Sequence, residues 1–328
     1  MGFASLTATL RFLGSPPAHV GLYINPVTSP ILVGSASWTD KTLIACGRFY
    51  PPGCRTAEQR LRFYAQQFPL VEVDSSYYAM PLPQTAQLWA DRTPPDFTFN
   101  VKAFRLFTGH QALPTALDRD LQKALGPGLP RTLYYEKLPQ EIRAELWRRF
   151  RGALEPLRGA GKLGAVHFQF APWLLRNRES IAHVEHCVQQ MEGFLVGVEF
   201  RHDTWFFGEH LERTLAWERD LGVVHTVVDS PQGFANCVPC VWDVTHPELA
   251  IVRLHGRNRE TWNRKGLAAS SGRFDYQYSA DELAAMVPEI EHLATQARRV
   301  HVVFNTNNED QGQVGARMLR ALLRVNAR

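Results

Sequence analysis

The stretch LVGVEFRHDTWF, residues 195–206, places a carboxylate, a guanidinium and an imidazole at the end of an apolar run. Residues 195–200 have the apolar, β-branched composition of a buried strand. Glu199 and Arg201 are two positions apart, so in a strand both side chains point to the same side, and His202 begins the following loop. Charged residues at this point are typical of the carboxyl end of a parallel sheet, where α/β proteins hold their ligands.

Similar runs recur along the 328 residues and predict further strands at 31–34, 70–73, 97–101, 163–168, 223–228, 251–254 and 300–304. Helical spacing predicts helices at 57–67, 86–91, 176–191, 211–220, 281–298 and 312–326. This alternation indicates parallel strands joined by crossover helices. Eight such strands close most economically into an α/β (β/α)₈ barrel, a TIM barrel, whereas an open, doubly wound sheet is the competing arrangement.

The barrel is predicted as one domain over residues 31–328, with insertions. Residues 1–30 are rich in Gly, Pro and Ser and predict a loose N-terminal arm. Residues 103–162 form a long insertion with room for extra helices. Residues 230–250 show no helical period and predict a loop.

The composition indicates a soluble globular protein. Hydrophobic residues make up 45% of the chain and charged residues 21%, and 36 Lys and Arg against 32 Asp and Glu give a net charge of +4. That excess is too small to indicate nucleic-acid binding by itself. No apolar run reaches the roughly 18 residues of a membrane span, and the N-terminus lacks the basic region of a signal peptide. Five scattered cysteines fit a reducing compartment. We expect a cytoplasmic protein that does not enter the membrane.

Polar residues follow nearly every predicted strand, and they are Ser35, Ser37, Glu72, Asp74, Lys102, Gln169, Glu199, Arg201, Asp229, Arg253, His255, Asn305 and Asn307. Because the carboxyl ends of parallel strands meet on one face, we expect these side chains to converge on a common cavity. Three same-side pairs carry charge: 72 with 74, 199 with 201, and 253 with 255. The alternative is structural, with the glutamates neutralising the arginines in an ion-pair network that fills the barrel mouth.

Nine motifs carry a family resemblance, and in chain order they read VGSASW, VEVDSSYYAMP, FTFNVKAFRLFTGH, HFQFAP, VEFRHDTWF, VVDSP, IVRLHGRN, FDYQYS and VFNTNN. From about residue 31 to about residue 325 the chain resembles the YecE-like family, domain of unknown function seventy-two. The resemblance implies a TIM barrel and no settled activity. Asp74 stands where that family usually has Asn, Asp203 where it has Pro, Gly109 is inserted before His110, and a second Trp after Trp38 is missing. These departures bear on specificity more than on fold.

The residue types at the strand ends favour an anion site. Lys102, Arg201 and Arg253 supply cations, and Arg forks suit phosphate or carboxylate oxygens. Glu72 and Glu199 are the candidate bases, and His202 or His255 the candidate acid. The other candidate substrate contacts are Asp74, Tyr77, Tyr78, Gln169, Asp229 and Asn305. Arg105, His110, Arg257 and Arg259 add charge in the adjoining loops, where a merely solvated loop is an equal interpretation for the last two.

A divalent metal, Zn²⁺ or Mn²⁺, is a less favoured hypothesis. The candidate ligands are Glu72, Asp74, Glu199, Asp229, His202 and His255, and two-metal centres in endonuclease-IV-like barrels use such ligands to cleave phosphodiesters. Arg201 and Arg253, however, share the side of the acidic residues and would repel a cation. No tight ligand spacing such as H-E-x-x-H occurs.

Cys237 and Cys240 form a single C-x-x-C pair. Together with Cys46 and Cys54 it could supply a four-thiolate zinc or iron–sulfur site, although incidental loop thiols are the favoured interpretation. The chain has no strand-linked glycine-rich phosphate fingerprint and no nucleophile elbow. That argues against nucleotide-dependent dehydrogenases, P-loop proteins and α/β-hydrolases.

The sequence therefore predicts a barrel protein that binds a phosphorylated, anionic substrate at its mouth and hydrolyses or otherwise processes it. A nucleic-acid phosphodiester falls within this class. The alternative is a non-catalytic module that binds nucleic acid or an anionic metabolite. The sequence leaves the substrate and the oligomeric state open.

Overall fold

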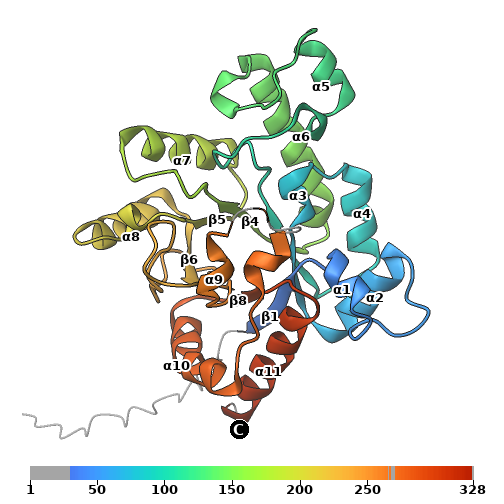
Figure 1. Ribbon diagram of the computed structural model, residues 1–328, viewed down its shortest axis with the longest axis vertical. Coiled ribbons are helices and arrows are strands. Elements are labelled where there is room, and N and C mark those ends of the chain that lie inside the picture. Colours follow the sequence, from blue (N-terminus) through green and yellow to red (C-terminus); the bar gives the residue numbers. More distant parts are fainter. Residues whose placement is uncertain (1–29, 265, 267–269, 327–328) are drawn as a thin grey trace, which may run out of the picture.

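The computed structural model describes residues 30–264, 266 and 270–326, and it contains a closed barrel of eight parallel strands (Figure 1). The predicted N-terminal arm lies outside the described residues, apart from Pro30. All eight predicted strands are confirmed, and they are β1 (Ile31–Ala36), β2 (Leu70–Val73), β3 (Thr98–Lys102), β4 (Leu163–Gln169), β5 (Val196–Glu199), β6 (Val224–Asp229), β7 (Ala250–Leu254) and β8 (Val300–Phe304).

Helices surround the barrel in the order of the chain (Figure 1). The six predicted helices are confirmed within a few residues as α2 (Ala57–Gln67), α4 (Pro83–Asp91), α7 (Arg178–Gln190), α8 (His210–Leu221), α10 (Ala280–Gln296) and α11 (Gln311–Asn326). Their ends follow local chemistry. Thr56 and Gln59 form a capping box at the start of α2, and Ser279 with Glu282 does the same for α10.

Pairing of β1 with β8 closes the sheet, with Ile31 opposite Val300 and Ser35 opposite Phe304. The open, doubly wound alternative is therefore wrong. Successive side chains alternate between the helices and the barrel interior, which is apolar at its base. One small cluster lies there, formed by Ala165, Val224, Leu249 and Ile251. A second, formed by Ala36, Leu70 and Val303, reaches up to the level of Glu72 and Arg253.

Above this base the interior is polar, and two glycines make room for it. A Cβ at Gly164 would lie 2.5 Å from the Asn100 Oδ1 atom and 2.8 Å from the His301 Cε1 atom. A Cβ at Gly197 would lie 2.7 Å from the Ile251 Cδ1 atom. Strands β4 and β5 therefore leave space at these levels for side chains of β3, β7 and β8.

The segment between β3 and β4 holds helices, as predicted for residues 103–162. These are the short η1 (Pro114–Ala116), α5 (Arg119–Ala124) and η2 (Tyr135–Lys137), followed by the crossover helix α6 (Gln140–Gly159). Figure 1 shows α5 standing away from the barrel beyond α6. The Trp147 ring on α6 stacks on Phe107 with 3.6 Å between centroids, which anchors the insertion to the end of β3.

Three short helices and a 3₁₀ turn complete the mouth of the barrel: α1 (Lys41–Ala45), α3 (Ser75–Tyr78), α9 (Arg259–Trp262) and η4 (Ser270–Phe274), with a further turn η3 (Asp203–Trp205) after β5. Residues 230–249 form neither helix nor strand, as predicted. Among the helices described here, none has the length and apolar character needed to cross a bilayer.

Candidate anion-binding site

The polar side chains at the strand ends lie at two depths along the barrel axis. Two positions along a strand separate the layers. Glu72, Glu199 and Arg253 form a lower layer that is fully buried. Asp74, Lys102 and Arg201 lie above them and line a cavity. The same-side pairs predicted from the sequence thus do point into the barrel, but of their upper members only Asp74 and Arg201 line the cavity, whereas His255 is buried.

Arg253 is the centre of the lower layer. Its Nη2 atom donates to Glu72 Oε1 at 2.6 Å, and its Nη1 atom donates to Glu199 Oε2. All three side chains are inaccessible to solvent. This is the structural ion-pair network that the sequence left as the alternative. Arg253 was predicted to hold the substrate, but its guanidinium is paired with Glu72 and Glu199 in this network.

Glu199 accepts contacts from five side chains. His255 Nε2 and Gln169 Nε2 donate to its Oε1 atom at 3.0 and 2.8 Å, and Arg201 Nη1 lies 3.5 Å from the same oxygen. His167 Nε2 donates to Oε2 at 3.2 Å beside Arg253. Burial alone would raise the pKa of Glu199, but Arg253 and His255 hold that pKa well below its ordinary value. A carboxylate surrounded in this way has no oxygen left to take a proton from a substrate.

The buried histidines of this layer are neutral. Burial lowers the pKa of His255 to about 3, despite the neighbouring Glu199, and burial together with Arg253 lowers the pKa of His167. Asn305 Nδ2 donates to His255 Nδ1 at 2.8 Å, so the proton of the neutral ring is on Nε2, facing Glu199. His255 therefore orients its neighbours, and the predicted role of an acid near neutral pH does not fit its surroundings.

Above this layer is a cavity of about 290 Å³. Charged and amide side chains line it together with aromatic rings: Asp74, Tyr77, Tyr78, Lys102, His110, Gln169, Phe170, Pro172, Trp173, Arg201, Asn236, Arg273, Phe274, Asn305 and Asn307. Its formal charges are three cations and one carboxylate. The cavity therefore favours an anionic ligand.

A hydrogen-bonded chain connects the cavity to the network below it. Lys102 Nζ donates to Asp74 Oδ1 at 2.8 Å and to Gln169 Oε1 at 2.9 Å, and Gln169 in turn donates to Glu199. Burial alone would raise the pKa of Asp74, but the Lys102 ammonium outweighs it and lowers that pKa. Burial opposes the charge on Lys102, yet Asp74 and Glu72 raise its pKa above the ordinary value. Both groups are charged at neutral pH.

Arg201 is a nearly buried cation with few partners among the described residues. Its side chain is 10% exposed, and its guanidinium carbon lies 4.8 Å from the centroid of the buried Trp262 ring. Within the described residues its hydrogen bonding consists of the single long contact to Glu199. Burial lowers the pKa of Arg201 from its ordinary value, although a guanidinium remains charged at neutral pH. Most of its N–H donors are therefore available to a ligand in the cavity.

An aromatic wall, defined as Tyr78, Tyr77, His110 and Trp173, forms one side of the cavity. Successive ring centroids along it are 4.9, 5.3 and 5.3 Å apart, in edge-on contacts. Local bonds fix the wall: the Arg105 amide donates to the Tyr77 carbonyl at 3.0 Å, and Trp173 Nε1 donates to the Gly109 carbonyl at 3.1 Å. Burial lowers the pKa of His110 to about 3, so this ring adds no charge.

Two predicted site residues lie outside both the cavity and the buried layer beneath it. His202 caps η3, where its Nδ1 atom accepts from the Thr204 amide at 3.3 Å. Asp229 accepts a two-pronged contact from Arg257, at 2.9 and 3.1 Å, and a hydrogen bond from Tyr278. The expectation that both face the common cavity is wrong. Asp229 pairs in register with Leu254, one position beyond the inward-facing Val228 and Arg253, so strand alternation turns its side chain toward the helices, where Arg257 and Tyr278 contact it. His202 is likewise one position beyond the inward-facing Arg201.

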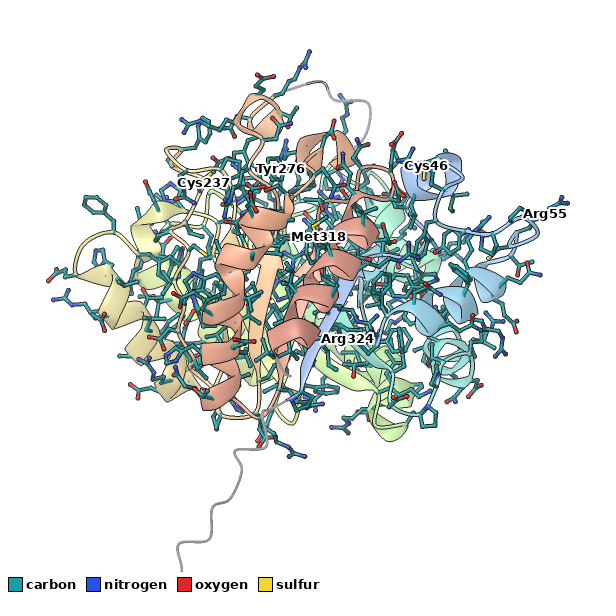
Figure 2. All side chains as sticks on the ribbon, turned by 90° about the horizontal axis from the view of Figure 1, so that it is seen from below. Cys46, Arg55, Cys237, Tyr276, Met318 and Arg324 are labelled. Atoms are coloured by element: carbon teal, nitrogen blue, oxygen red, sulfur yellow. The ribbon has the colours of Figure 1, made fainter. Side chains whose placement is uncertain are left out.

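The predicted metal ligands do not gather into a site. Among the described residues no group of three or more His, Cys, Asp or Glu side chains is placed to hold a metal ion. Glu72 and Glu199 flank Arg253, while Asp229 and His202 lie elsewhere. Figure 2 shows Cys46 and Cys237 at the same end of the molecule but on opposite sides of it. The four-thiolate hypothesis is therefore wrong, and all five cysteines are free thiols.

Sequence reasoning missed some residues of the site. His167 lies two positions before Gln169 on β4. The period-two argument that paired Glu72 with Asp74 could therefore have found it. Asn236, Arg273 and Phe274 also line the cavity, but they come from a loop and from the short η4, which show no periodicity in the sequence. Nothing in the sequence signals their direction.

Fold and site together define a TIM-barrel protein with a charged, aromatic-walled cavity at the carboxyl ends of its strands. The model of the family "Protein of unknown function DUF72" matches residues 32–328. The UPF0759 protein YunF of Bacillus subtilis (strain 168) is 32% identical over 296 residues, which cover 89% of this chain and 94% of that protein. The chain belongs to the DUF72 family.

Solved structures of the same family share the fold. A DUF72 family protein of Enterococcus faecalis V583 matches with a TM-score of 0.74 at 22% identity, over 90% of this chain and 95% of that chain. A DUF72 family protein of Thermotoga maritima MSB8 matches with a TM-score of 0.71 at 24% identity, over 90% and 99% of the two chains. The resemblance expected from the nine motifs is thereby confirmed.

Proposed function

We propose that the cavity binds a small phosphorylated compound and that the protein hydrolyses its phosphate ester. The observation that carries the proposal is Arg201, a nearly buried guanidinium that faces the cavity with one long contact to a carboxylate. A buried cation without a close partner is costly unless a ligand compensates for it. The guanidinium fork matches the oxygens of a phosphate, and Lys102 and Arg273 add charge on the same cavity.

The size of the cavity supports a small ligand. About 290 Å³ is at the lower limit of the pockets that hold small molecules. A nucleic-acid duplex contacts a broad basic surface, which a cavity of this size does not offer. A small phosphate ester fits the volume and the charge better than an extended strand.

Asp74 is the base that the cavity offers. It is ionised, it lines the cavity, and Lys102 holds it in place. In the proposed reaction a water oxygen attacks phosphorus while Asp74 takes the water proton. The ester P–O bond breaks, and the departing oxygen takes a proton from the Tyr77 hydroxyl, whose pKa burial raises. Arg201 and Lys102 stabilise the negative charge that builds on the phosphoryl oxygens.

The test of binding is calorimetric titration of the full chain with inorganic phosphate and with ribose 5-phosphate. Arg201→Met keeps the length and much of the bulk of the side chain and should weaken both by tenfold or more, because a charge-assisted hydrogen bond is lost. Arg298→Met is the matched control, since Arg298 is 74% exposed and pairs with Glu248 outside the cavity. Equal affinity in wild type and Arg201→Met would contradict the proposal.

The test of hydrolysis is phosphate release from the same ester in wild type and Asp74→Asn. Loss of a general base lowers kcat by about 10²–10⁴-fold. The affinity of the variant for phosphate should be retained or increased, because a negative charge leaves the cavity. Tight binding by the wild-type protein without any release would establish the non-catalytic module instead.

A further inference from the structure

We infer that the phosphorylated ligand carries a planar base, so that the cavity is a site for a nucleoside monophosphate. The inference rests on the proposed function and adds the class of the ligand. It comes from the aromatic wall, of which the proposed reaction uses only the Tyr77 hydroxyl.

The two ends of the wall are unusually open for rings of their size. Trp173 is 61% exposed and Tyr78 is 46% exposed, and both line the cavity. Neither ring is loose, since Trp173 is fixed through its Nε1 bond to Gly109 and Tyr78 packs edge-on against Tyr77. A rigid, exposed aromatic ring beside a cavity is the arrangement on which bases stack.

One of the cations that would hold the anion lies beside the middle of the wall. Lys102 Nζ lies 4.7 Å from the centroid of the Tyr77 ring, in the middle of the wall. A ligand whose phosphate contacts Lys102 and Arg201 therefore has its remaining atoms next to aromatic surface, towards either Tyr78 or Trp173. This distance suits a phosphate and a ring within one small molecule.

The amides of the cavity favour a base over an aliphatic tail. Asn236 and Asn307 line the cavity together with Gln169. Among the described residues the Asn307 Oδ1 atom is buried without a hydrogen-bond partner, so it can accept from the hydrogen-bonding edge of a base, whereas an alkyl chain would leave it without a partner. A sugar ring could lie on Trp173 as well, so the experiment has to separate the base from the sugar.

The experiment compares AMP with ribose 5-phosphate, which lacks only the base, and with adenosine, which lacks only the phosphate. Calorimetry on the full chain should show AMP binding at least tenfold more tightly than ribose 5-phosphate, within the range of about five- to a hundredfold expected for one stacked base. Trp173→Ala and Tyr78→Ala are the test variants. At least one should bring AMP close to ribose 5-phosphate, and both should leave the ribose 5-phosphate affinity within about twofold.

Phe207→Ala is the matched control, because Phe207 is 77% exposed but does not line the cavity. If AMP and ribose 5-phosphate bind equally tightly and Arg201→Met weakens both, the inference of a base is wrong and the proposed phosphate site is retained. AMP binding no tighter than adenosine would overturn the phosphate site and with it the mononucleotide. Parallel losses for AMP and ribose 5-phosphate in Trp173→Ala would assign the ring to the sugar and overturn the inference.

Discussion

Glu199 shows how the surroundings of one side chain decide its role. Its carboxylate compensates Arg253 and orients Gln169, His255 and His167 through direct contacts. Such a group is a positioning residue, because it holds in place the side chains that form the floor of the cavity. The chemistry of the cavity belongs to the layer above it.

Replacing Glu199 should therefore reduce stability. We expect Glu199→Gln to lower the free energy of unfolding by about 3 kcal/mol, since it removes one partner of a buried ion pair. Urea unfolding measures the change. Glu155→Gln is the control, as its surface pair with Arg158 is worth about 1 kcal/mol or less. Unchanged stability together with lost turnover would return Glu199 to the catalytic role first predicted for it.

Most residues of the site could be predicted from the sequence. Which of them are buried and which line the cavity could not. The period-two spacing correctly placed Glu72 with Asp74 and Glu199 with Arg201 inside the barrel. One step of two residues moves a side chain about 6–7 Å along the strand, which separates a buried ion pair from a cavity wall. The sequence does not contain that boundary, because the loops that form the upper part of the cavity have no period.

At the scale of elements, the loop between β6 and β7 depends on a buried ion pair. Glu218 on α8 lies 3.0 Å from His225 Nδ1, and His225 Nε2 lies 3.2 Å from the Val241 carbonyl in the loop. Both ring nitrogens face acceptors, so the imidazolium donates from both. Burial alone would lower the pKa of His225, but Glu218 and the more distant Asp243 raise it above the ordinary value of 6.5.

This pair predicts a pH dependence of stability. Because the folded pKa is raised, the contribution of His225 is fully present below about pH 6.5 and is lost as pH rises through the raised pKa. Urea midpoints between pH 5.5 and 9 should therefore fall more steeply in wild type than in His225→Gln. His292→Gln, at an exposed position on α10, should follow wild type. Parallel curves for wild type and His225→Gln would contradict the prediction.

The elements themselves were accessible from the sequence wherever they are periodic. Strands and main helices came out within a few residues, because their buried faces repeat every 2 or 3.6 positions. Pro83 at the first turn of α4 extends that helix beyond its predicted start, since proline is favoured there. The orientations of His202 and Asp229 were missed although the period-two rule applies to them, because each is one position beyond an inward-facing residue, Arg201 or Val228.

At the scale of the whole molecule, the cavity is formed by segments from most of the barrel. Its lining comes from the carboxyl ends of strands β2 to β5 and β8, from the loop that precedes β7, and from η4. A ligand bound there connects the first and last quarters of the chain. Binding should therefore stabilise the fold as a unit.

Thermal unfolding measures that coupling. At a ribose 5-phosphate concentration of about 100 times its Kd, binding should add about 2.7 kcal/mol to the free energy of unfolding and raise Tm by a few degrees. Arg201→Met should show a smaller rise at the same concentration, and Arg298→Met the full one. A rise of the same size in all three proteins would point to binding outside the cavity.

The buried network has a consequence for how this protein can diversify. Arg253, Glu72 and Glu199 satisfy one another across the barrel, so changing any one of them leaves an uncompensated charge in the interior. Asn236 and Trp173 lie on loops and Arg273 lies in η4, and none of the three compensates a buried charge. Within the lineage, new ligand preferences should therefore arise at these three positions by single replacements, while the three charged ones persist together or are exchanged together.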